Sequence, residues 1–242
     1  MEYETYVIGD IHGGLKALEQ VIDKIGLQEN DQMIFLGDYV DGLPQSAQVI
    51  DFLIELDATF SCIFIRGNHD FWWQQWLETG HPDPDWLNEG GSSTLLSYQY
   101  YDKKQLEKHL HFSRKLQNFH IDDRQNLFIH AGFTSLAGPE KEISPAYLYN
   151  DRTLLETAMV FEHLQNFQTY PFPVRLKLFN EIFIGHTPTV KFGSQFPMHA
   201  ANLWDIDTGV KKNGRLTVLN VKTKHFWQSD PGSILYPDET GN

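Results

Sequence analysis

Five short blocks of polar residues and glycine recur along the chain, and each follows a run of apolar residues. The blocks are Gly9-Asp10-Ile11-His12-Gly13, Gly37-Asp38-Tyr39-Val40-Asp41-Gly42, Gly67-Asn68-His69-Asp70, His130-Ala131-Gly132 and Gly185-His186-Thr187. They share aspartate, histidine and asparagine, whose side chains bind cations or transfer protons in proteins. The glycines allow tight turns that bring side chains and backbone close together. We therefore look for the chemistry of this protein in these blocks.

The donor atoms of the blocks form a metal-ligand set without thiolate. We expect strand ends to direct six side chains into one crevice: Asp10, His12, Asp38, Asn68, His130 and His186. Carboxylate, imidazole and amide donors suit Mn²⁺, Fe²⁺ or Zn²⁺ better than a structural zinc held by sulfur. Six ligands are too many for one catalytic ion with open positions. Two ions that share a carboxylate fit better, at the roughly 3.5–4 Å separation of two-metal hydrolytic sites.

The elements that must position these residues alternate between strand and helix in the first third of the chain. Apolar runs and helical spacing predict strands at 6–8, 33–36 and 61–65 and helices at 15–25 and 47–56. Such alternation indicates βαβ units, in which ligands bind beyond the carboxyl ends of the strands.

The remainder of the chain has a less regular pattern. We expect helices at 71–79 and within 92–116 and 145–168, strands at 127–129, 182–184 and 203–206, and a hairpin at 216–221 and 225–228. Together the patterns predict an α/β fold, organised as a single domain over residues 1–242.

Composition excludes several classes of partner. The 242 residues include 19 Lys and Arg against 32 Asp and Glu, a net charge of −13. Such an acidic chain is poorly suited to bind nucleic acid or an anionic membrane. A single cysteine, Cys62, excludes an internal disulfide. No apolar run approaches the roughly 18 residues of a membrane helix, and the start lacks a signal-peptide pattern, so we expect a cytoplasmic protein.

The five blocks, in this order over residues 9–187, resemble the signature of the metal-dependent phosphoprotein phosphatases, the serine/threonine phosphatases among the calcineurin-like metallophosphoesterases. Asp207-Thr208-Gly209 resembles a further motif of bacterial members. The resemblance implies a calcineurin-like fold, in which mixed β-sheets pack as a sandwich flanked by helices. It also implies a ligand assignment: Asp10 and His12 on one ion, and Asp38 bridging both. The ligands implied for the second ion are Asn68, His130 and His186.

The resemblance assigns further roles to residues around the metal ions. His69 would be the general acid, oriented by Asp41. The substrate phosphate would be contacted by Arg66, Arg152 and Asn68. Arg66 directly precedes a block, whereas Arg152 rests on a looser similarity.

Two features of the blocks bear on the substrate. Gly185-His186-Thr187-Pro188 lacks the last ligand of the Gly-His-x-His pattern of phosphodiesterase and nuclease relatives. This favours phosphomonoesterases and the related dinucleoside tetraphosphatases. The family usually has Asp-Arg-Gly after its second block, but here Asp41 is followed by Gly42-Leu43, so an expected phosphate-binding arginine is missing.

We therefore predict hydrolysis of phosphomonoesters by a serine/threonine phosphatase that uses two divalent ions, Mn²⁺ first and Fe²⁺ or Zn²⁺ as alternatives. Its substrate would be a phosphoprotein or a small phosphoester. The alternative enzyme is a symmetrical bis(5'-nucleosyl)-tetraphosphatase. The alternative outside enzymes is an inactive metal-binding interaction module, although His69 and Asp41 would not be needed for metal binding alone.

Each candidate residue also has an ordinary structural interpretation. Single aspartates commonly cap helices or close turns, and single histidines pack in cores. Arg66 could serve in a structural ion pair. The joint order and spacing of the blocks favour the metal site. Two other phosphate chemistries are excluded, because Cys62 stands too close to Arg66 for a cysteine phosphatase loop and Leu43-Pro44 replaces the Lys-Ser/Thr of a nucleotide-binding loop.

Overall fold

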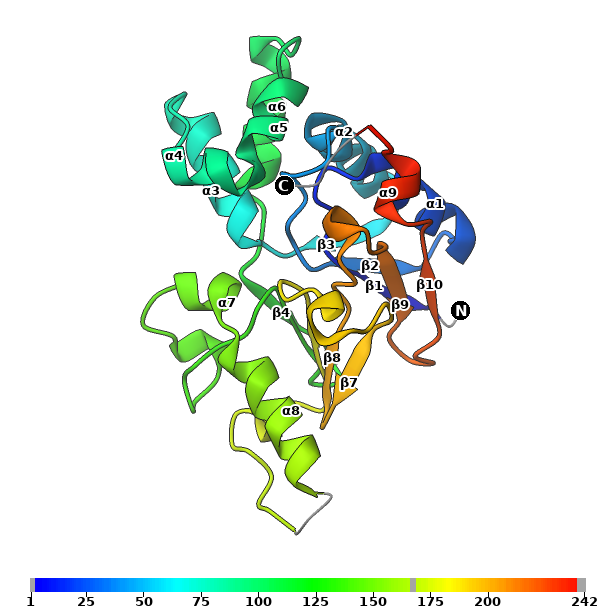
Figure 1. The fold of residues 1–242 in the computed structure, drawn as a ribbon, viewed down its shortest axis with the longest axis vertical. Helices are drawn as coiled ribbons and strands as arrows, with labels where there is room; N and C mark the ends of the chain where they lie inside the picture. Colours follow the sequence, from blue (N-terminus) through cyan, green and yellow to red (C-terminus); the bar gives the residue numbers. More distant parts are fainter. Residues whose placement is uncertain (1–2, 166–168, 239–242) are drawn as a thin grey trace.

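The computed structural model describes residues 3–165 and 169–238, and two five-stranded β-sheets form its centre (Figure 1). The first sheet has the order β10-β9-β1-β2-β3 and the second the order β4-β5-β6-β8-β7. The strands of the first sheet are β1 Thr5–Ile8, β2 Gln32–Phe35, β3 Ser61–Phe64, β9 Thr217–Asn220 and β10 Phe226–Gln228. Those of the second are β4 Phe119–Ile121, β5 Leu127–Ile129, β6 Ile182–Ile184, β7 Met198–Ala200 and β8 Leu203–Asp205.

Each sheet combines parallel and antiparallel pairing. Strands β1, β2 and β3 are parallel, and β9 pairs antiparallel with β1 and β10. In the second sheet β5, β6 and β8 are parallel, whereas β4 and β7 pair antiparallel with them. The predicted hairpin at the end of the chain is confirmed as β9 and β10.

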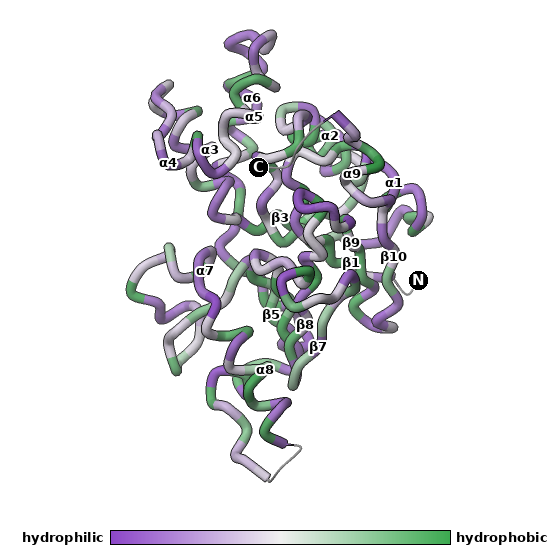
Figure 2. Tube along the Cα trace, in the orientation of Figure 1, coloured by the Kyte–Doolittle hydropathy of each residue, from purple (hydrophilic) through white to green (hydrophobic). Residues whose placement is uncertain are grey.

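The sheets pack face to face through apolar side chains. Val7 and Ile34 from the first sheet meet Phe128 and Phe183 from the second in one buried cluster. The rings of Phe128 and Phe183 stack with their centroids 5.0 Å apart. Figure 2 shows β5 as a hydrophobic segment inside the molecule and α4 as a hydrophilic one at its periphery. The predicted sandwich of mixed sheets is confirmed.

Helices cover the outer faces of both sheets. Helices α1 (Leu15–Ile25) and α2 (Ser46–Asp57) bury one apolar side against the first sheet, where Leu18 and Leu53 join Ile8 in a core cluster. Strand side chains alternate between the two faces, so Ile8 points to the helices while Val7 points to the other sheet. Helix α8 (Thr153–Gln165) covers the second sheet.

A group of helices between β3 and β4 lies at one end of the molecule (Figure 1). It consists of α3 Asn68–Thr79, α4 Pro84–Trp86, a π-helical turn at Leu87–Gly91, α5 Ser92–Ser97 and α6 Lys103–Ser113. Trp73 and Trp86 are fully buried within it. The other short helical elements are α7 Ala146–Asn150, α9 Gly232–Leu235, and 3₁₀ turns at Pro139–Lys141, Leu176–Leu178, Thr189–Phe192 and Val210–Lys212.

The segments expected to be mostly helical contain α5 and α6 within 92–116, and α7 and α8 within 145–165, with 166–168 outside the described residues. The edge strands β4 and β7 were absent from the prediction. Within the described ranges, no helix has the length and apolarity required to cross a membrane.

Candidate metal centre

The polar blocks converge where the parallel strands of both sheets end. Asp10 follows β1, Asp38 follows β2, and Asn68 opens α3 just after β3. On the second sheet, His130 follows β5 and His186 follows β6. All the predicted ligands except Asn68 are buried, and Asn68 is partly exposed. The sandwich thus gathers residues from both sheets at one edge.

Asp38 lies at the centre of two groups of potential metal ligands. One group is His12, Asp38 and His69, and the other is Asp38, His130 and His186. Within each group the donor atoms lie within 4.8 Å of one another. His12 Nε2 is 3.6 Å from Asp38 Oδ2, whereas His130 Nε2 is 3.5 Å from Asp38 Oδ1. The two oxygens of one carboxylate therefore face different groups, as a bridging ligand requires.

Asn68 and Asp10 complete the predicted set. Asn68 Oδ1 is 3.2 Å from His130 Nε2 and 3.0 Å from His186 Nδ1. Asp10 Oδ2 lies 4.0 Å from His12 Nε2 and accepts a hydrogen bond from the His186 backbone N–H at 3.1 Å. The structure thus brings all six predicted ligands together.

The histidines are held in the form that binds metal. Nδ1 of His12 lies 3.2 Å from the Val40 carbonyl and Nδ1 of His130 lies 2.8 Å from the Leu36 carbonyl, so each donates there and leaves Nε2 as an acceptor. Burial lowers the pKa of His12 to about 3 and also lowers the pKa values of His130 and His186. Neutral imidazole is the metal-binding form. His186 Nε2 is buried without a hydrogen-bond partner in the part of the chain that the structure describes.

Negative charge is concentrated behind these histidines. Burial, with Asp207 and Asp38 nearby, raises the pKa of Asp10 well above its usual value. Burial also raises the pKa values of Asp70 and Asp207 to about 7. A divalent cation would neutralise this cluster, and the oxygen and nitrogen donors present fit such a cation. These residues therefore fit the metal ions that the sequence implies.

The backbone at the site is strained. Eight residues other than glycine have a positive φ in the described ranges, and four belong to the blocks: His12 at 50°, Asp38 at 51°, Asp41 at 73° and His186 at 68°. Such conformations cost on the order of 1–3 kcal/mol each and persist where surrounding contacts impose them. The strain indicates that the placement of the side chains, rather than the conformational preference of the backbone, determines these turns.

Two glycines make room for the carboxylates. A Cβ at Gly67 would lie 2.1 Å from Asp38 Oδ1, and a Cβ at Gly185 would lie 2.1 Å from Asp10 Oδ1. Any larger residue would displace the ligand oxygen itself. The glycines of the blocks are therefore required by close approach as much as by the turns.

Asp70 holds two of the blocks together. Its carboxylate accepts hydrogen bonds from the backbone N–H groups of Asp38 at 2.7 Å, Tyr39 at 2.9 Å and Gly67 at 2.8 Å. This residue belongs to a predicted block, but the sequence analysis assigned no role to it. Its contacts fix the turn after β2 against the start of α3.

His69 and Asp41 form a buried pair beside Asp38. His69 Nδ1 lies 2.7 Å from Asp41 Oδ2, which also accepts a hydrogen bond from Trp86 Nε1 at 2.6 Å. Thr94 Oγ1 donates to Asp41 Oδ1 at 2.6 Å. Burial alone would lower the pKa of His69, but Asp38 and Asp41 outweigh it and the pKa is raised. Trp86 and Thr94 were missed by the sequence analysis, because they lie 45 and 53 positions beyond Asp41.

The site opens into a pocket of about 170 Å³. Its wall includes Arg152 and three lysines that the sequence analysis did not single out: Lys191, Lys211 and Lys212. Arg66 is absent from this wall, and its guanidinium donates to Gln74 Oε1 at 3.0 Å and Asn118 Oδ1 at 3.4 Å. Of the two predicted arginines, the structure thus brings Arg152 to the pocket.

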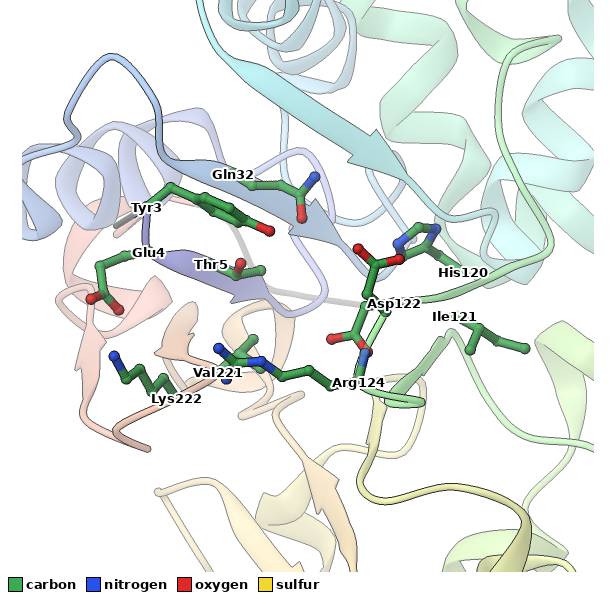
Figure 3. Close-up of a pocket in the computed structure, with 11 residues that line it drawn as sticks. Tyr3, Glu4, Thr5, Gln32, His120, Ile121, Asp122, Arg124, Val221 and Lys222 are labelled. Carbon is green, nitrogen blue, oxygen red and sulfur yellow. The ribbon is translucent and has the colours of Figure 1, made fainter. Parts of the chain in front are cut away.

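A larger cavity, of about 370 Å³, lies at the opposite edge of the sheets (Figure 3). Thr5 and Gln32, the first residues of β1 and β2, line it together with Asp122, Arg124 and Lys222. Neither group of potential metal ligands lies there. The chemistry is therefore concentrated in the smaller pocket.

Comparison with known proteins agrees with this geometry. A model of the calcineurin-like phosphoesterases matches residues 4–214. The chain belongs to this family. The site described above is thus that of a phosphoester hydrolase family, as the resemblance of the blocks implied.

The similar proteins differ in how much of the chain they match. A bis(5'-nucleosyl)-tetraphosphatase PrpE of the asymmetrical type from Oceanobacillus iheyensis is 25% identical, over 91% of this chain and 89% of its own. A candidate serine/threonine-protein phosphatase of Caenorhabditis elegans is 42% identical, but over 26% of this chain and 14% of its own. The crystal structure of a candidate diadenosine tetraphosphatase shares the fold, with a TM-score of 0.65, 16% identity and coverage of 95% and 94%.

Proposed function

We propose that this protein hydrolyses bis(5'-nucleosyl) tetraphosphates with two divalent metal ions held around Asp38. The observation that carries the proposal is the shared Asp38 carboxylate between two ligand groups at the base of a pocket. The relative from Oceanobacillus iheyensis, similar over most of both chains, supports a dinucleotide substrate. This revises the preference for a serine/threonine phosphatase, whose cited match covers about a quarter of the chain.

The metal ligands in this proposal are the six residues at the strand ends. Asp10 and His12 would hold one ion, Asp38 both, and the second ion would have three further ligands: Asn68, His130 and His186. When bound, two such ions supply a nucleophilic hydroxide near neutral pH and withdraw charge from the phosphate oxygens. Mn²⁺ is the metal we propose, because carboxylate, amide and imidazole donors suit it.

The remaining residues of the site bind the substrate and move a proton. Arg152 on the pocket wall would contact phosphate oxygens. His69 would donate the proton of its Nε2 to the leaving oxygen, while Asp41 accepts from Nδ1 and keeps the ring oriented. Trp86 and Thr94 hold Asp41 in turn, which leaves that carboxylate few other orientations.

The test is a substrate panel on the purified full chain, with its metal content measured. Diadenosine tetraphosphate and a phosphoserine peptide are assayed side by side with added Mn²⁺, and nucleotide products are separated by chromatography. We expect ATP and AMP in equal amounts, as for an asymmetrical enzyme. Two ADP would instead indicate symmetrical cleavage. Turnover of the peptide alone would overturn the proposal, and metal binding without any hydrolysis would favour an interaction module.

A further inference from the structure

Lys211 occupies the space in front of Gly42, where the family's second block usually has arginine. A Cβ at Gly42 would lie 2.6 Å from Lys211 Cδ, 2.8 Å from Cε and 2.9 Å from Cγ. The Lys211 ammonium donates to the Glu89 carbonyl at 3.0 Å. The stem of this lysine thus lies against the glycine, and a side chain at position 42 would displace it.

The ammonium of Lys211 acts on the metal centre electrostatically. Burial lowers the pKa of Lys211, and Asp41 and Asp38 act against that shift. Lys211 lines the same pocket as His12, Asp38 and His69. The lysine is therefore within electrostatic range of the groups at the base of the pocket, although it comes from the 3₁₀ turn at Val210–Lys212.

Three further cations share the pocket wall with Lys211. They are Arg152, Lys191 and Lys212. The pKa of Lys191 is lowered first by burial and then by the charges of Arg152 and Lys212, so these groups lie close enough to repel one another. Among the described residues, none of the four forms an ion pair with a carboxylate within 4.0 Å. Four cations gather at one opening, which Glu89 and Asp207 also line, in a chain whose net charge is −13.

We propose that Lys211, together with Lys191, Lys212 and Arg152, forms a subsite for the phosphate chain of a polyphosphate substrate beyond the reacting phosphate. This inference rests on the proposed function. A monoester places one phosphate at the metal centre and leaves most of these cations without an anion. A polyphosphate chain carries further negative phosphates that could reach them, and lysine binds phosphate as a point charge.

The test compares Lys211→Met, which keeps most of the stem but removes the charge, with Lys211→Arg, which keeps both. Lys104→Met, at an exposed position on α6 outside the pocket, is the matched control. We expect Lys211→Met to raise KM for diadenosine tetraphosphate about tenfold, and KM for p-nitrophenyl phosphate less than about twofold. Lys211→Arg and Lys104→Met should stay within about twofold of the unaltered protein.

Inorganic tripolyphosphate separates this inference from the proposed function. Its inhibition of p-nitrophenyl phosphate hydrolysis is measured with Mn²⁺ in excess, and its binding to the metal-loaded protein is measured by equilibrium dialysis. Lys211→Met should weaken both about tenfold, even if the protein cleaves no dinucleotide. That result would uphold the subsite while the proposed function fails. An equal loss with the monoester, or unchanged tripolyphosphate binding, would overturn the subsite.

Discussion

The position of His69 is compatible with two roles, proton donor and metal ligand. Its Nε2 is 4.0 Å from Asp38 Oδ2, and it belongs with His12 and Asp38 to one group of potential ligands. Its Nδ1, however, is engaged by Asp41 at 2.7 Å. A ligand needs a lone pair on the free nitrogen, whereas an acid needs a proton there. The two roles can be separated by experiment.

We predict that His69→Asn retains two metal ions per chain but lowers kcat for a substrate with a poor leaving group by roughly 10²–10⁴. The loss should be much smaller for p-nitrophenyl phosphate, whose leaving group needs little protonation. Metal analysis and steady-state kinetics on both substrates check this. A variant that loses one metal ion would instead identify His69 as a ligand.

Gly185 tests the importance of close approach at the site. Alanine there would place its Cβ 2.1 Å from Asp10 Oδ1, so we predict at least about tenfold weaker metal binding, because the ligand oxygen must move. Gly193→Ala is the control. Gly193 has a positive φ, of 79°, unlike Gly185, but a Cβ there would meet nothing within 4 Å. Metal titrations followed by calorimetry should show the loss for position 185 alone.

Among single residues, the candidate metal ligands were predictable from the sequence and the residues of the pocket wall were not. Asp10, Asp38 and the three histidines follow apolar strands, so the order of the chain revealed them. Lys211 and Lys212 lie in a 3₁₀ turn with no such signal, and lysines are common on any protein surface. The phosphate contact of Arg66, indicated by its place beside a block, stays a prediction; its guanidinium donates to Gln74 and Asn118.

The helices between β3 and β4 supply His69 from α3 and the two side chains that hold Asp41, Trp86 from α4 and Thr94 from α5. Trp86 ends α4 and donates its Nε1–H to Asp41 at 2.6 Å. Trp76, its aromatic neighbour at 6.0 Å between ring centroids, makes no such bond in the part of the chain described. The group of helices between β3 and β4 therefore helps to orient the Asp41–His69 pair from outside the pocket.

We predict that Trp86→Phe lowers kcat about tenfold with little change in KM or metal content, because Asp41 loses one of its two anchors. Trp76→Phe, the matched control, should leave kcat within about twofold. The decrease for Trp86→Phe should grow with poorer leaving groups, as an effect on proton donation requires. An equal fall in both variants would mean general loss of packing.

Asp51 connects helices α2 and α6. Its carboxylate accepts from Tyr101 Oη at 2.6 Å and lies 3.1 Å from His109 Nε2, while His109 Nδ1 lies 2.7 Å from Tyr98 Oη. Burial alone would raise the pKa of Asp51. The hydrogen bonds from Tyr101 and His109 lower it by more than burial raises it, so the net shift of the pKa is downward. The charged carboxylate thus stabilises the folded chain.

We predict that Asp51→Asn lowers the free energy of unfolding by about 1 kcal/mol at pH 7. A depressed pKa contributes stability above the unfolded value, near 3.9, and this contribution disappears as the pH falls through the folded pKa. The difference between variant and unaltered protein should therefore shrink below about pH 4. Urea unfolding at pH 7 and pH 3.5 measures it, and a difference that does not depend on pH would contradict the assignment.

The strands that carry the blocks and the helices α1 and α2 were predicted almost to the residue, whereas the breaks between the later helices were not. Apolar runs such as 33–36 and 182–184 are buried on both faces, so hydrophobicity alone marks them. The break near Gly90, where φ is 113°, and the break before α8 follow local turn chemistry that a periodic pattern conceals. Edge strands β4 and β7 have only three residues each, too few to show alternation.

Residues from both sheets of the molecule meet at the candidate metal centre. Asp10 and Asp38 come from the first sheet, and His130 and His186 come from the second. A metal ion bound to residues of both sheets would link them. Since binding to the folded state alone stabilises it, metal should raise overall stability.

We predict that Mn²⁺ at about 100 times its Kd stabilises the protein by about 2.7 kcal/mol, and that a chelator reverses the effect. Thermal unfolding with and without Mn²⁺ measures this, with Ca²⁺ as the control cation. His186→Ala should remove most of the increase in Tm. An increase that survives this substitution would place the stabilising ion elsewhere.

Substrate choice was the part of the function that sequence patterns predicted least well. The blocks describe a metal centre suited to many phosphoesters, and the centre itself does not distinguish a phosphoserine from a nucleotide. We expect the pocket wall to make that distinction. Its residues, such as Lys191 and Lys211, come from turns far apart in the chain. The single domain expected over residues 1–242 stays a prediction.

Strand β9 lies between β1 and β10, although it begins at residue 217, near the end of the chain. One edge of β1, the strand that precedes Asp10, therefore stays unpaired until residues 217–220 have been synthesised. Contacts this distant in sequence form late, because long loops must close first. The Gly9 N–H, directly before Asp10, donates to the Thr217 carbonyl at 3.1 Å, so the turn that places Asp10 would reach its final form only after β9 has paired.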